Sequence, residues 1–459
     1  MQFGPYDMLL DFCIVAGLLL VGQILRAKFR IIQSMYLPAS VIAGALGIIL
    51  GSQFLDVLPF SKNIASYPYM LVVVLFATLF IGNEKIDSVK KVVSEVGDTF
   101  SYSMVAEIGQ FGIALLFGIV VLKQFFPELH QGFALMLPAG WAGGFGYATA
   151  MGGVLQNYGF KDALTVGYTM ATAGMLSGIF GGLIFINLAT RLGITRFVKA
   201  MAVLPESMKT GLLPPEERKP IGMGTVSAGC IDPVAWHLVL ILIATGAGYY
   251  ANQYFKVIMP KYDVPMMCLS MLAGVFLQLI LNRVNLGQYV DKDVSTRIGS
   301  CVTDFMVCFG IASMKIAIVV QYAVPLILLC ILGFVWCGGF LWYLGPRMLH
   351  NYWFERALFC WGWATGVVAT GVTLLRIIDP EFRSKALQDY GLAYIFIAFV
   401  EIFLVSLTPV FVGMGYLGET AAVLVGVSLL IFVLSIKAGY WYSPNRTELR
   451  PGEEESVGM

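Results

Sequence analysis

The chain has little charge and few of the residues on which metal sites depend. Only 12% of its 459 residues are charged and its formal net charge is +1, whereas a soluble protein has about 25% charged residues. Its three histidines are scattered without metal-ligand spacing, and none of its eight cysteines forms a CxxC pair. Composition and spacing therefore indicate no transition-metal site, no disulfide framework and no nucleic-acid partner.

Sequence motifs of enzymes are also missing. The chain has no nucleophile elbow, no phosphate-binding loop and no HExxH pattern, so we expect neither an enzyme nor a bound cofactor. Hydrophobic residues are plentiful instead, at 58%, and the mean hydropathy is +0.80. This composition predicts a polytopic membrane protein. The first apolar run lacks the basic start of a signal peptide, and we expect it to be retained as a helix.

A five-residue pattern occurs twice, each time within an apolar, Gly-rich stretch. The copies are Gly-Trp-Ala-Gly-Gly at 140–144 and Gly-Trp-Ala-Thr-Gly at 362–366, and each is soon followed by Ala-Thr. Each stretch then reaches a predicted polar turn that ends in Tyr-Gly, at 157–159 and 389–391. Chance similarity between Gly-rich helices is the alternative. Broken apolar segments in corresponding positions of two halves nevertheless favour the binding site of a transporter.

Hydropathy predicts eleven membrane crossings, since a crossing helix needs about 20 apolar residues. They are 8–25, 36–54, 68–82, 100–122, 163–187, 234–252, 264–281, 299–319, 322–343, 391–410 and 419–436. If the two Gly-rich stretches are re-entrant hairpins, 23 basic residues fall on one side of the membrane and five on the other. The positive-inside rule then places the N-terminus outside and the C-terminus in the cytoplasm.

These crossings divide the chain into two halves and a connecting linker. Five crossings precede the linker, so the second half is inverted and the two hairpins enter from opposite faces to meet near the midplane. The predicted parts are a first repeat, 1–187, with a hairpin at 132–156; a cytoplasmic linker, 188–233; a second repeat, 234–412, with a hairpin at 356–375; an additional helix, 413–437; and a cytoplasmic tail, 438–459.

Several short patterns, in order over residues 35–400, resemble the bacterial sodium/glutamate symporters. They are Tyr36-Leu37-Pro38 with Ala43-Gly44, Leu75-Phe76-Ala77-Thr78 with Ile81-Gly82-Asn83, Ala171-Thr172 with the following glycines, and Gly362, Gly366 and Ala369-Thr370. The resemblance implies an all-α fold of two inverted five-helix repeats. It also implies a homodimer, an elevator-like motion and sodium-coupled uptake of glutamate or a related amino acid or dicarboxylate across a prokaryotic inner membrane.

The hairpins supply the candidate residues for binding an organic anion. Glycines let the backbone approach a ligand closely, hydroxyls can donate hydrogen bonds, and aromatic rings can line a pocket. The candidates are Trp141, Gly143, Gly144, Gly146, Tyr147, Thr149, Trp363, Thr365, Gly366 and Thr370.

Oxygen-bearing residues near the hairpins are candidates for holding sodium, which prefers hard oxygen ligands. They are Gln110, Thr172, Ser177 and Glu401. Other interpretations remain open. Glu107 or Glu401 could bind a proton in a proton-coupled transporter or exchanger, or could make structural bonds within the bundle, for instance from Glu401 to Lys315. A non-transporting scaffold or a membrane enzyme is the alternative of another class.

Overall fold

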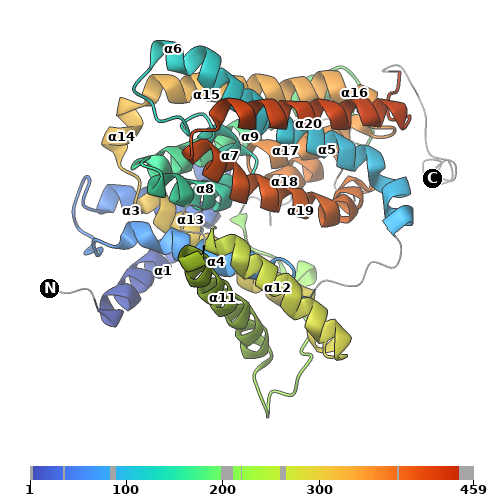
Figure 1. Ribbon diagram of the computed structural model, residues 1–459. Coiled ribbons are helices and arrows are strands. Elements are labelled where there is room, and N and C mark those ends of the chain that lie inside the picture. The colour runs from blue at the N-terminus through green and yellow to red at the C-terminus, as the bar shows by residue number, and fades with distance from the viewer. Residues whose placement is uncertain are drawn as a thin grey trace. The chain divides into compact units, whose positions relative to one another are not determined.

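The computed structural model is all-helical in the residues that it describes. These are residues 4–34, 37–82, 89–197, 210–218, 220–258, 265–379 and 382–443, and they contain no β-strand. Figure 1 shows the helices in chain order. Parts of the expected linker, 188–233, and most of the expected tail, 438–459, lie outside the described residues.

Each of the eleven expected crossings corresponds to a helix. Among the described residues, nine segments are long and apolar enough to span a membrane. Their helices are α1 (Pro5–Lys28), α5 (Val89–Phe117), α9 (Ala163–Arg191), α11 (Pro233–Ile258), α12 (Met266–Arg283), α13 (Lys292–Ala312), α15 (Ala323–Gly339), α19 (Ala386–Gly413) and α20 (Leu417–Lys437). The other two, α3 (Ala39–Leu50) and α4 (Tyr67–Thr78), have 12 residues each. The protein is therefore a multi-pass membrane protein.

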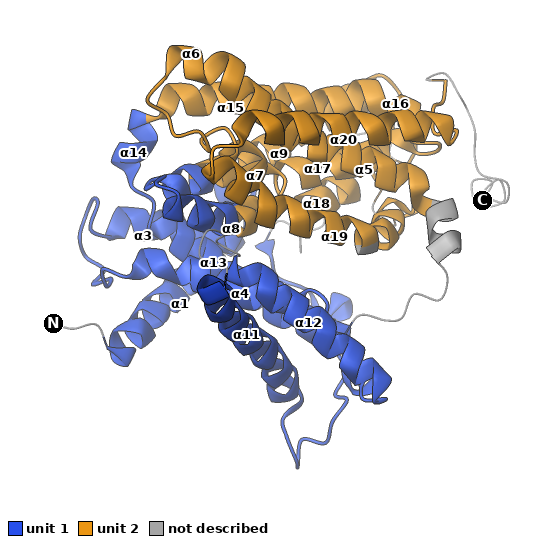
Figure 2. Ribbon diagram, viewed as in Figure 1, with its two compact units in different colours: residues 1–86, 148–168, 205–321 blue, residues 87–147, 169–204, 322–459 orange. Residues whose placement is uncertain are grey.

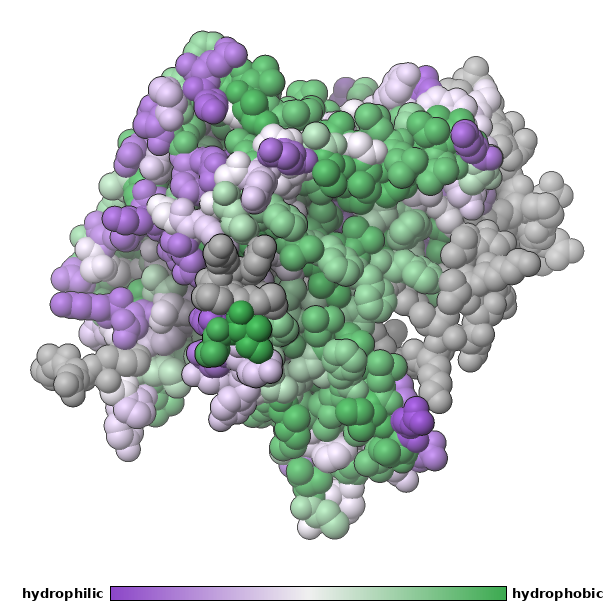
Figure 3. Space-filling view, viewed as in Figure 1, coloured by the Kyte–Doolittle hydropathy of each residue, from purple (hydrophilic) through white to green (hydrophobic). Residues whose placement is uncertain are grey.

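Several of these helices expose apolar side chains. Leu429 and Leu430 on α20 are 58% and 57% exposed, and Val257 on α11 is 81% exposed. Figure 3 shows hydrophobic residues, drawn green, over much of the visible surface of α20 and of the α11–α12 pair. Water would disfavour such surfaces, whereas lipid tails accommodate them, so these faces suit the bilayer.

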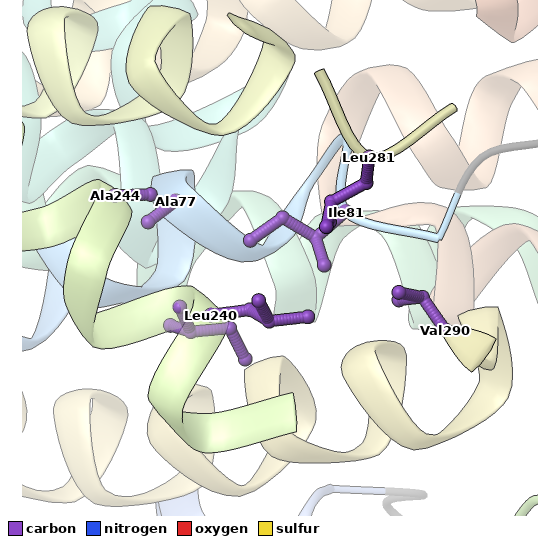
Figure 4. Close-up of a cluster of buried hydrophobic side chains, with 7 residues drawn as sticks. Ala77, Ile81, Leu240, Ala244, Leu281 and Val290 are labelled. Atoms are coloured by element: carbon purple, nitrogen blue, oxygen red, sulfur yellow. The ribbon is translucent and has the colours of Figure 1, made fainter. Parts of the chain in front are cut away.

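The chain forms two compact units, coloured in Figure 2. Unit 1 comprises residues 1–86, 148–168 and 205–321. In it, α4, α11 and α12 share the buried cluster of Figure 4, which consists of Ala77, Ile81, Leu240, Ile241, Ala244, Leu281 and Val290. Small residues bring the helices close: a Cβ added to Gly274 of α12 would lie 2.8 Å from the Ala77 carbonyl oxygen of α4. Such contacts are typical of packing between membrane helices.

Unit 2 comprises residues 87–147, 169–204 and 322–459, and α5 is covered on several sides within it. Gly109 and Gly112 of α5 lie against Ser428 and Val425 of α20. The Ser428 hydroxyl donates to the Val105 carbonyl at 3.0 Å, and Trp336 Nε1 of α15 donates to the Ala106 carbonyl at 2.9 Å. The middle of α5 is therefore shielded on the sides that face α15 and α20.

Both Gly-rich stretches are broken helices, as the sequence predicts. The first forms α7 (Met136–Trp141) and α8 (Gly144–Asn157), and the second forms α17 (Trp353–Thr365) and α18 (Val368–Ile378). α17 and α18 pack side by side, because glycines face each other: a Cβ on Gly362 would lie 2.5 Å from Gly371 Cα. In the first stretch the two compact units divide at α8, with residues up to 147 in unit 2 and residues 148–157 in unit 1.

The two predicted Tyr-Gly turns have different outcomes. The turn at 157–159 is confirmed, since α8 ends at Asn157 and Gly159 has φ +95°. The prediction of a turn at 389–391 is wrong, because these residues lie within α19. Asp389 forms a buried ion pair with Arg356 at 3.3 Å and is not a solvated turn residue. The turn precedes α19 instead, where the Asp379 carboxylate accepts from the Arg383 and Ser384 amides.

The expected crossing 299–319 is also too long. α13 ends at Ala312, and Lys315 is an exposed residue before the short helix α14 (Ile316–Gln321). Lys315 therefore lies outside the spanning helix and is not the buried ion-pair partner that the sequence allowed.

Candidate functional site

The two helix breaks form two tips in unit 2. After α7, the chain turns at Gly144, whose φ of +58° suits glycine. After α17, it turns through Gly366 at φ −134° and ψ −92°, followed by an extended Val367. A break of this kind leaves carbonyls at the end of one helix and amides at the start of the next without helical partners. These groups are available to a cation and to an anion respectively.

The two tips touch each other. A Cβ on Gly144 would lie 2.8 Å from Val367 Cγ1 and 3.1 Å from the Gly366 carbonyl oxygen. The backbones can approach this closely because Gly144 has no side chain. The expectation that the two broken segments meet is thus confirmed for their tips.

Aromatic residues surround the first tip. The Tyr147 ring covers Gly143 so closely that a Cβ there would lie 1.7 Å from the ring, which excludes any side chain in this conformation. The Tyr147 phenol also hydrogen-bonds Glu401. Trp141 is fully buried, with its indole against Gly174 of α9. The first tip is therefore held by its own aromatic side chains.

The second tip lies on a glycine face of α9. Cβ atoms on Gly174 and Gly178 would lie 2.4 Å from the Thr365 carbonyl oxygen and 2.6 Å from Thr365 Oγ1. Trp361 Nε1 donates to the Gly178 carbonyl at 2.9 Å, and Thr365 Oγ1 donates to the Trp361 carbonyl at 2.7 Å. The hydroxyl and carbonyl of Thr365 are thereby fixed against α9.

Gln110 of α5 reaches the same tip. This fully buried side chain donates through Nε2 to the Ala364 carbonyl at 3.4 Å and lies 3.5 Å from Cys337 Sγ. The amide thus binds one of the last carbonyls of α17, where that helix opens.

Two carboxylates lie in the interior of unit 2. Glu107 of α5 is 1% exposed and Glu401 of α19 is 8% exposed. The Tyr394 hydroxyl donates to Glu401 Oε2 at 3.1 Å, and Tyr147 is the second phenol bonded to this carboxylate. Both Glu107 carboxylate oxygens and Gln110 Oε1, by contrast, have no hydrogen-bond partner among the described residues. The sequence singled out both acids but missed Tyr394, although its i, i+7 spacing places it on the Glu401 face of the helix.

The remaining predicted residues lie in several places. Trp363 packs against Tyr390 with ring centroids 5.3 Å apart, and the Thr370 hydroxyl lies beside Gly366. Thr172 and Ser177 are half-buried on α9, the helix that carries Gly174 and Gly178. The predicted site residues that lie in unit 2 are Trp141, Gly143, Gly144, Gly146, Tyr147, Trp363, Thr365, Gly366, Thr370, Thr172, Ser177, Glu401 and Gln110.

Thr149 is the exception among the predicted residues. It belongs to unit 1, where its hydroxyl donates to the Tyr168 hydroxyl at 3.2 Å. Thr149 is therefore not part of the group of predicted site residues in unit 2.

A buried charge cluster fixes the base of the second hairpin. Arg356 at the start of α17 donates to both oxygens of Asp98 of α5, each at 2.9 Å, and also to the Thr99 hydroxyl. Asp98 further contacts His350 Nδ1 at 2.5 Å, and Arg356 pairs with Asp389 of α19. The sequence indicated Arg356 only as one of many loop charges. Nothing local in the sequence pairs it with an acid 258 residues away.

The oxygens at the tips suit an alkali cation better than a transition metal. In the part of the chain that the structure describes, no three His, Cys, Asp or Glu side chains gather as metal ligands. The tips present backbone carbonyls, with the hydroxyls of Thr365 and Thr370 near them, and such hard oxygens suit sodium.

Comparison with known protein families places most of the chain in one of them. The model of the sodium/glutamate symporter family matches residues 5–384. The chain belongs to the sodium/glutamate symporter family. The match includes both broken helices and ends just before α19, which carries Glu401. A search of curated proteins finds no match.

Proposed function

We propose that this member of the sodium/glutamate symporter family is a sodium-coupled symporter for a small organic anion, namely glutamate or a related amino acid or dicarboxylate. One observation carries the proposal: the tips of two broken helices touch, both tips lie in unit 2, and the Gly366 carbonyl is at the point of contact. Contact between half-helix ends is the arrangement by which membrane transporters bind charged ligands.

The two kinds of free backbone group suggest where each ion binds. The N-terminal ends of α8 and α18 carry the positive end of the helix dipole and would receive the substrate carboxylates. Thr370 and the aromatic residues Trp141, Tyr147 and Trp363 would position the rest of the substrate. Sodium would bind the opened carbonyls at the end of α17, with Thr172 and Ser177 of α9 as hydroxyl ligands and Gln110 and Glu401 as further oxygen donors.

The motion and the oligomeric state that we propose come from the family resemblance. Because unit 2 holds both tips, we assign it the moving part in an elevator-like cycle. Unit 1 would then supply the scaffold and the contacts of a homodimer. We further propose that the protein lies in the inner membrane of a prokaryote, with the N-terminus outside.

Uptake of radiolabelled glutamate and related organic acids into proteoliposomes tests this function. We expect accumulation that requires an inward sodium gradient. Thr172→Val and Thr370→Val should weaken substrate and sodium affinity together, roughly tenfold, because linkage between two ligands is reciprocal. Thr303→Val is the matched control, since its hydroxyl donates to the Gly299 carbonyl of its own helix, α13. Equal uptake with and without sodium would refute sodium coupling.

A further inference from the structure

Three oxygen atoms in the interior of unit 2 are buried without a hydrogen-bond donor among the described residues. They are both carboxylate oxygens of Glu107 and Oε1 of Gln110. Glu107 is 1% exposed and Gln110 is fully buried. Burying an acceptor without a donor is unfavourable, and burying a carboxylate charge without a counter-charge is more so. These oxygens therefore need a partner that the described side chains do not supply.

Residues that flank Glu107 on α5 contact α17. Ser103 Oγ lies 3.7 Å from Cys360 Sγ, and Gln110 Nε2 donates to the Ala364 carbonyl at 3.4 Å. Ser103, Glu107 and Gln110 are spaced i, i+4 and i+7, which places them on one face of the helix. Glu107 therefore lies on the face of α5 that packs against α17, between the levels of Cys360 and Ala364.

The side-chain amide of Gln110 has a fixed orientation. Its Nε2 lies 3.4 Å from the Ala364 carbonyl oxygen and 3.5 Å from Cys337 Sγ, so both of its N–H donors have partners. Oε1 is the atom without one. The Ala364 carbonyl belongs to the last turn of α17, where carbonyls lack helical partners. A free acceptor is thus held beside the open end of α17, one turn along α5 from a carboxylate.

No basic side chain among the described residues balances the charge of Glu107. The ion pairs in the described part of unit 2 all belong to the cluster around Arg356. That guanidinium already pairs with Asp98 and Asp389. Asp98 precedes Glu107 by nine residues, which is about 13 Å along the helix. The counter-charge of Glu107 must therefore be a small ion.

The three oxygens indicate which small ion fits. One bound proton would create a single O–H donor for the remaining acceptors, whereas a sodium ion can contact all three oxygens at once. Carboxylate and amide oxygens are hard ligands that suit sodium, and a single carboxylate balances one positive charge. In the part of the chain that the structure describes, no three His, Cys, Asp or Glu side chains gather to hold another metal.

We propose that Glu107 and Gln110 bind a second sodium ion, on the α5 side of the second tip. The ion contacts both carboxylate oxygens of Glu107 and Oε1 of Gln110. The first ion lies on the α9 side, where the carbonyl and hydroxyl of Thr365 face that helix. Of the oxygen donors proposed for sodium, Gln110 then belongs to the second ion. The identity of this ion rests on the proposed sodium coupling, whereas the position of the site rests on the contacts of α5.

An ion at this position connects α5 with the open end of α17. It fixes the Gln110 side chain, whose Nε2 binds the Ala364 carbonyl just before the second tip. Binding of the ion therefore orders the tip whose Gly366 carbonyl lies against Gly144. Because an ordered tip receives the substrate more readily, the ion and the substrate strengthen each other's binding by the same factor.

Binding of radioactive sodium to the purified protein in detergent tests the site without any transport. Glu107→Gln keeps the shape of the side chain and removes its charge, so we expect it to bind one sodium ion fewer per chain than the wild type. Glu419→Gln, at an exposed acid on α20, is the matched control and should bind as many ions as the wild type. Equal numbers of ions bound to Glu107→Gln and to the wild type would overturn the proposal.

A measurement on the wild type alone covers the case in which Glu107→Gln does not fold. Hydrophobic carbodiimides modify carboxyl groups inside membrane proteins, and mass spectrometry identifies the modified residue. At one pH, sodium should slow the modification of Glu107 severalfold relative to the same concentration of N-methylglucamine. Modification of the exposed Glu419 should not change. If sodium leaves the rate at Glu107 unchanged, the proposal is wrong and a proton is the partner of this carboxylate.

Uptake separates this site from the proposed function. The initial rate of glutamate uptake should rise sigmoidally with sodium concentration in the wild type and in Glu419→Gln, and hyperbolically in Glu107→Gln. A sigmoidal dependence retained in Glu107→Gln would contradict the coupling of the second ion. Absence of any uptake would count against the proposed symport function, while the number of bound sodium ions would still decide the site.

Discussion

Glycine at the two tips is required for different physical reasons. Gly144 has a positive φ and borders Val367 and the Gly366 carbonyl, so both its conformation and its surroundings exclude a side chain. Gly143 is covered by the Tyr147 ring, and a Cβ on Gly366 would lie 2.7 Å from Thr370 Oγ1. β-branched side chains add both volume and conformational restriction at such positions.

We therefore predict that Gly144→Val and Gly366→Val abolish transport while membrane insertion persists. The added methyl groups push the tips apart, whereas insertion depends on the apolar helices elsewhere. Uptake into proteoliposomes and the amount of protein extracted from membranes measure the two effects. Gly426→Val on α20 is the control, because nothing lies within 4 Å of its Cβ position. Near-normal uptake by either tip variant would contradict the proposed site.

A second prediction at this scale concerns Glu355 at the start of α17. This side chain is 1% exposed and accepts the Arg196 amide at 2.9 Å. Burial raises the pKa of Glu355 from 4.5 to about 7, and the charge of Asp379 contributes in the same direction. Between pH 4.5 and about pH 7, Glu355 is therefore protonated in the folded state and ionised in the unfolded state. The free energy of unfolding therefore falls as pH rises from 4.5 through 7, by up to about 3 kcal/mol.

Glu355→Gln removes this titration. Its melting temperature should match that of the wild type near pH 4.5 and exceed it at pH 8, where the wild type contains a buried charge. Thermal unfolding of the detergent-solubilised protein at the two pH values measures the difference. The melting temperature of Glu419→Gln should equal that of the wild type at both pH values. If the melting temperatures of Glu355→Gln and the wild type change with pH in parallel, Glu355 is not the group that titrates.

At the scale of helices, Arg356 joins three elements at one point. It contacts Asp98 of α5 and Asp389 of α19 from the start of α17. The base of the second hairpin is thereby fixed, while its tip ends in an exposed Val367. The second hairpin is thus anchored to α5 and α19 at the end opposite its tip.

Arg356→Ala should destabilise the protein by about 3–5 kcal/mol, because it removes the guanidinium that pairs with two buried carboxylates, Asp98 and Asp389. Thermal unfolding in detergent measures the loss. Arg376→Ala, at an exposed arginine of α18, should change stability little. Adding Asp98→Asn and Asp389→Asn to Arg356→Ala should restore part of the loss. Failure of this triple variant to recover stability would show that packing, rather than charge, holds the base.

The sequence predicts the helices and the breaks well because both have local causes. Apolar length marks the spans, and the repeated Gly-Trp-Ala pattern marks both tips. Two features have causes distant in the sequence and could not be predicted. In the sequence, Asp389 resembles a turn residue. Its role depends on Arg356, 33 positions earlier, which the fold places beside it. The role of Tyr394 is apparent only in the structure, where Tyr394 and Tyr147 both bond the Glu401 carboxylate.

At the scale of the whole molecule, the charges of the loops predict its orientation. Cys230 is an exposed cysteine within the linker expected in the cytoplasm, and Lys62 is exposed in a loop expected outside. In intact cells, an impermeant thiol reagent should therefore label a single-cysteine Lys62→Cys variant and spare one that retains only Cys230. Permeabilised cells should show labelling of both. Labelling of Cys230 but not of Lys62→Cys in intact cells would show that the orientation is the reverse of the predicted one.

The order of the site residues along the chain has a consequence for how such transporters diversify. Both tips precede residue 386, where α19 begins, and α20 follows α19. A natural or engineered exchange of 386–437 between relatives would replace Glu401 and Tyr394 of α19 while leaving Tyr147 and the tip glycines intact. If Glu401 holds the coupling ion as proposed, the choice of this ion is inherited separately from the choice of substrate. A chimera whose sodium dependence changes while its substrate stays the same would be the direct sign of this modularity.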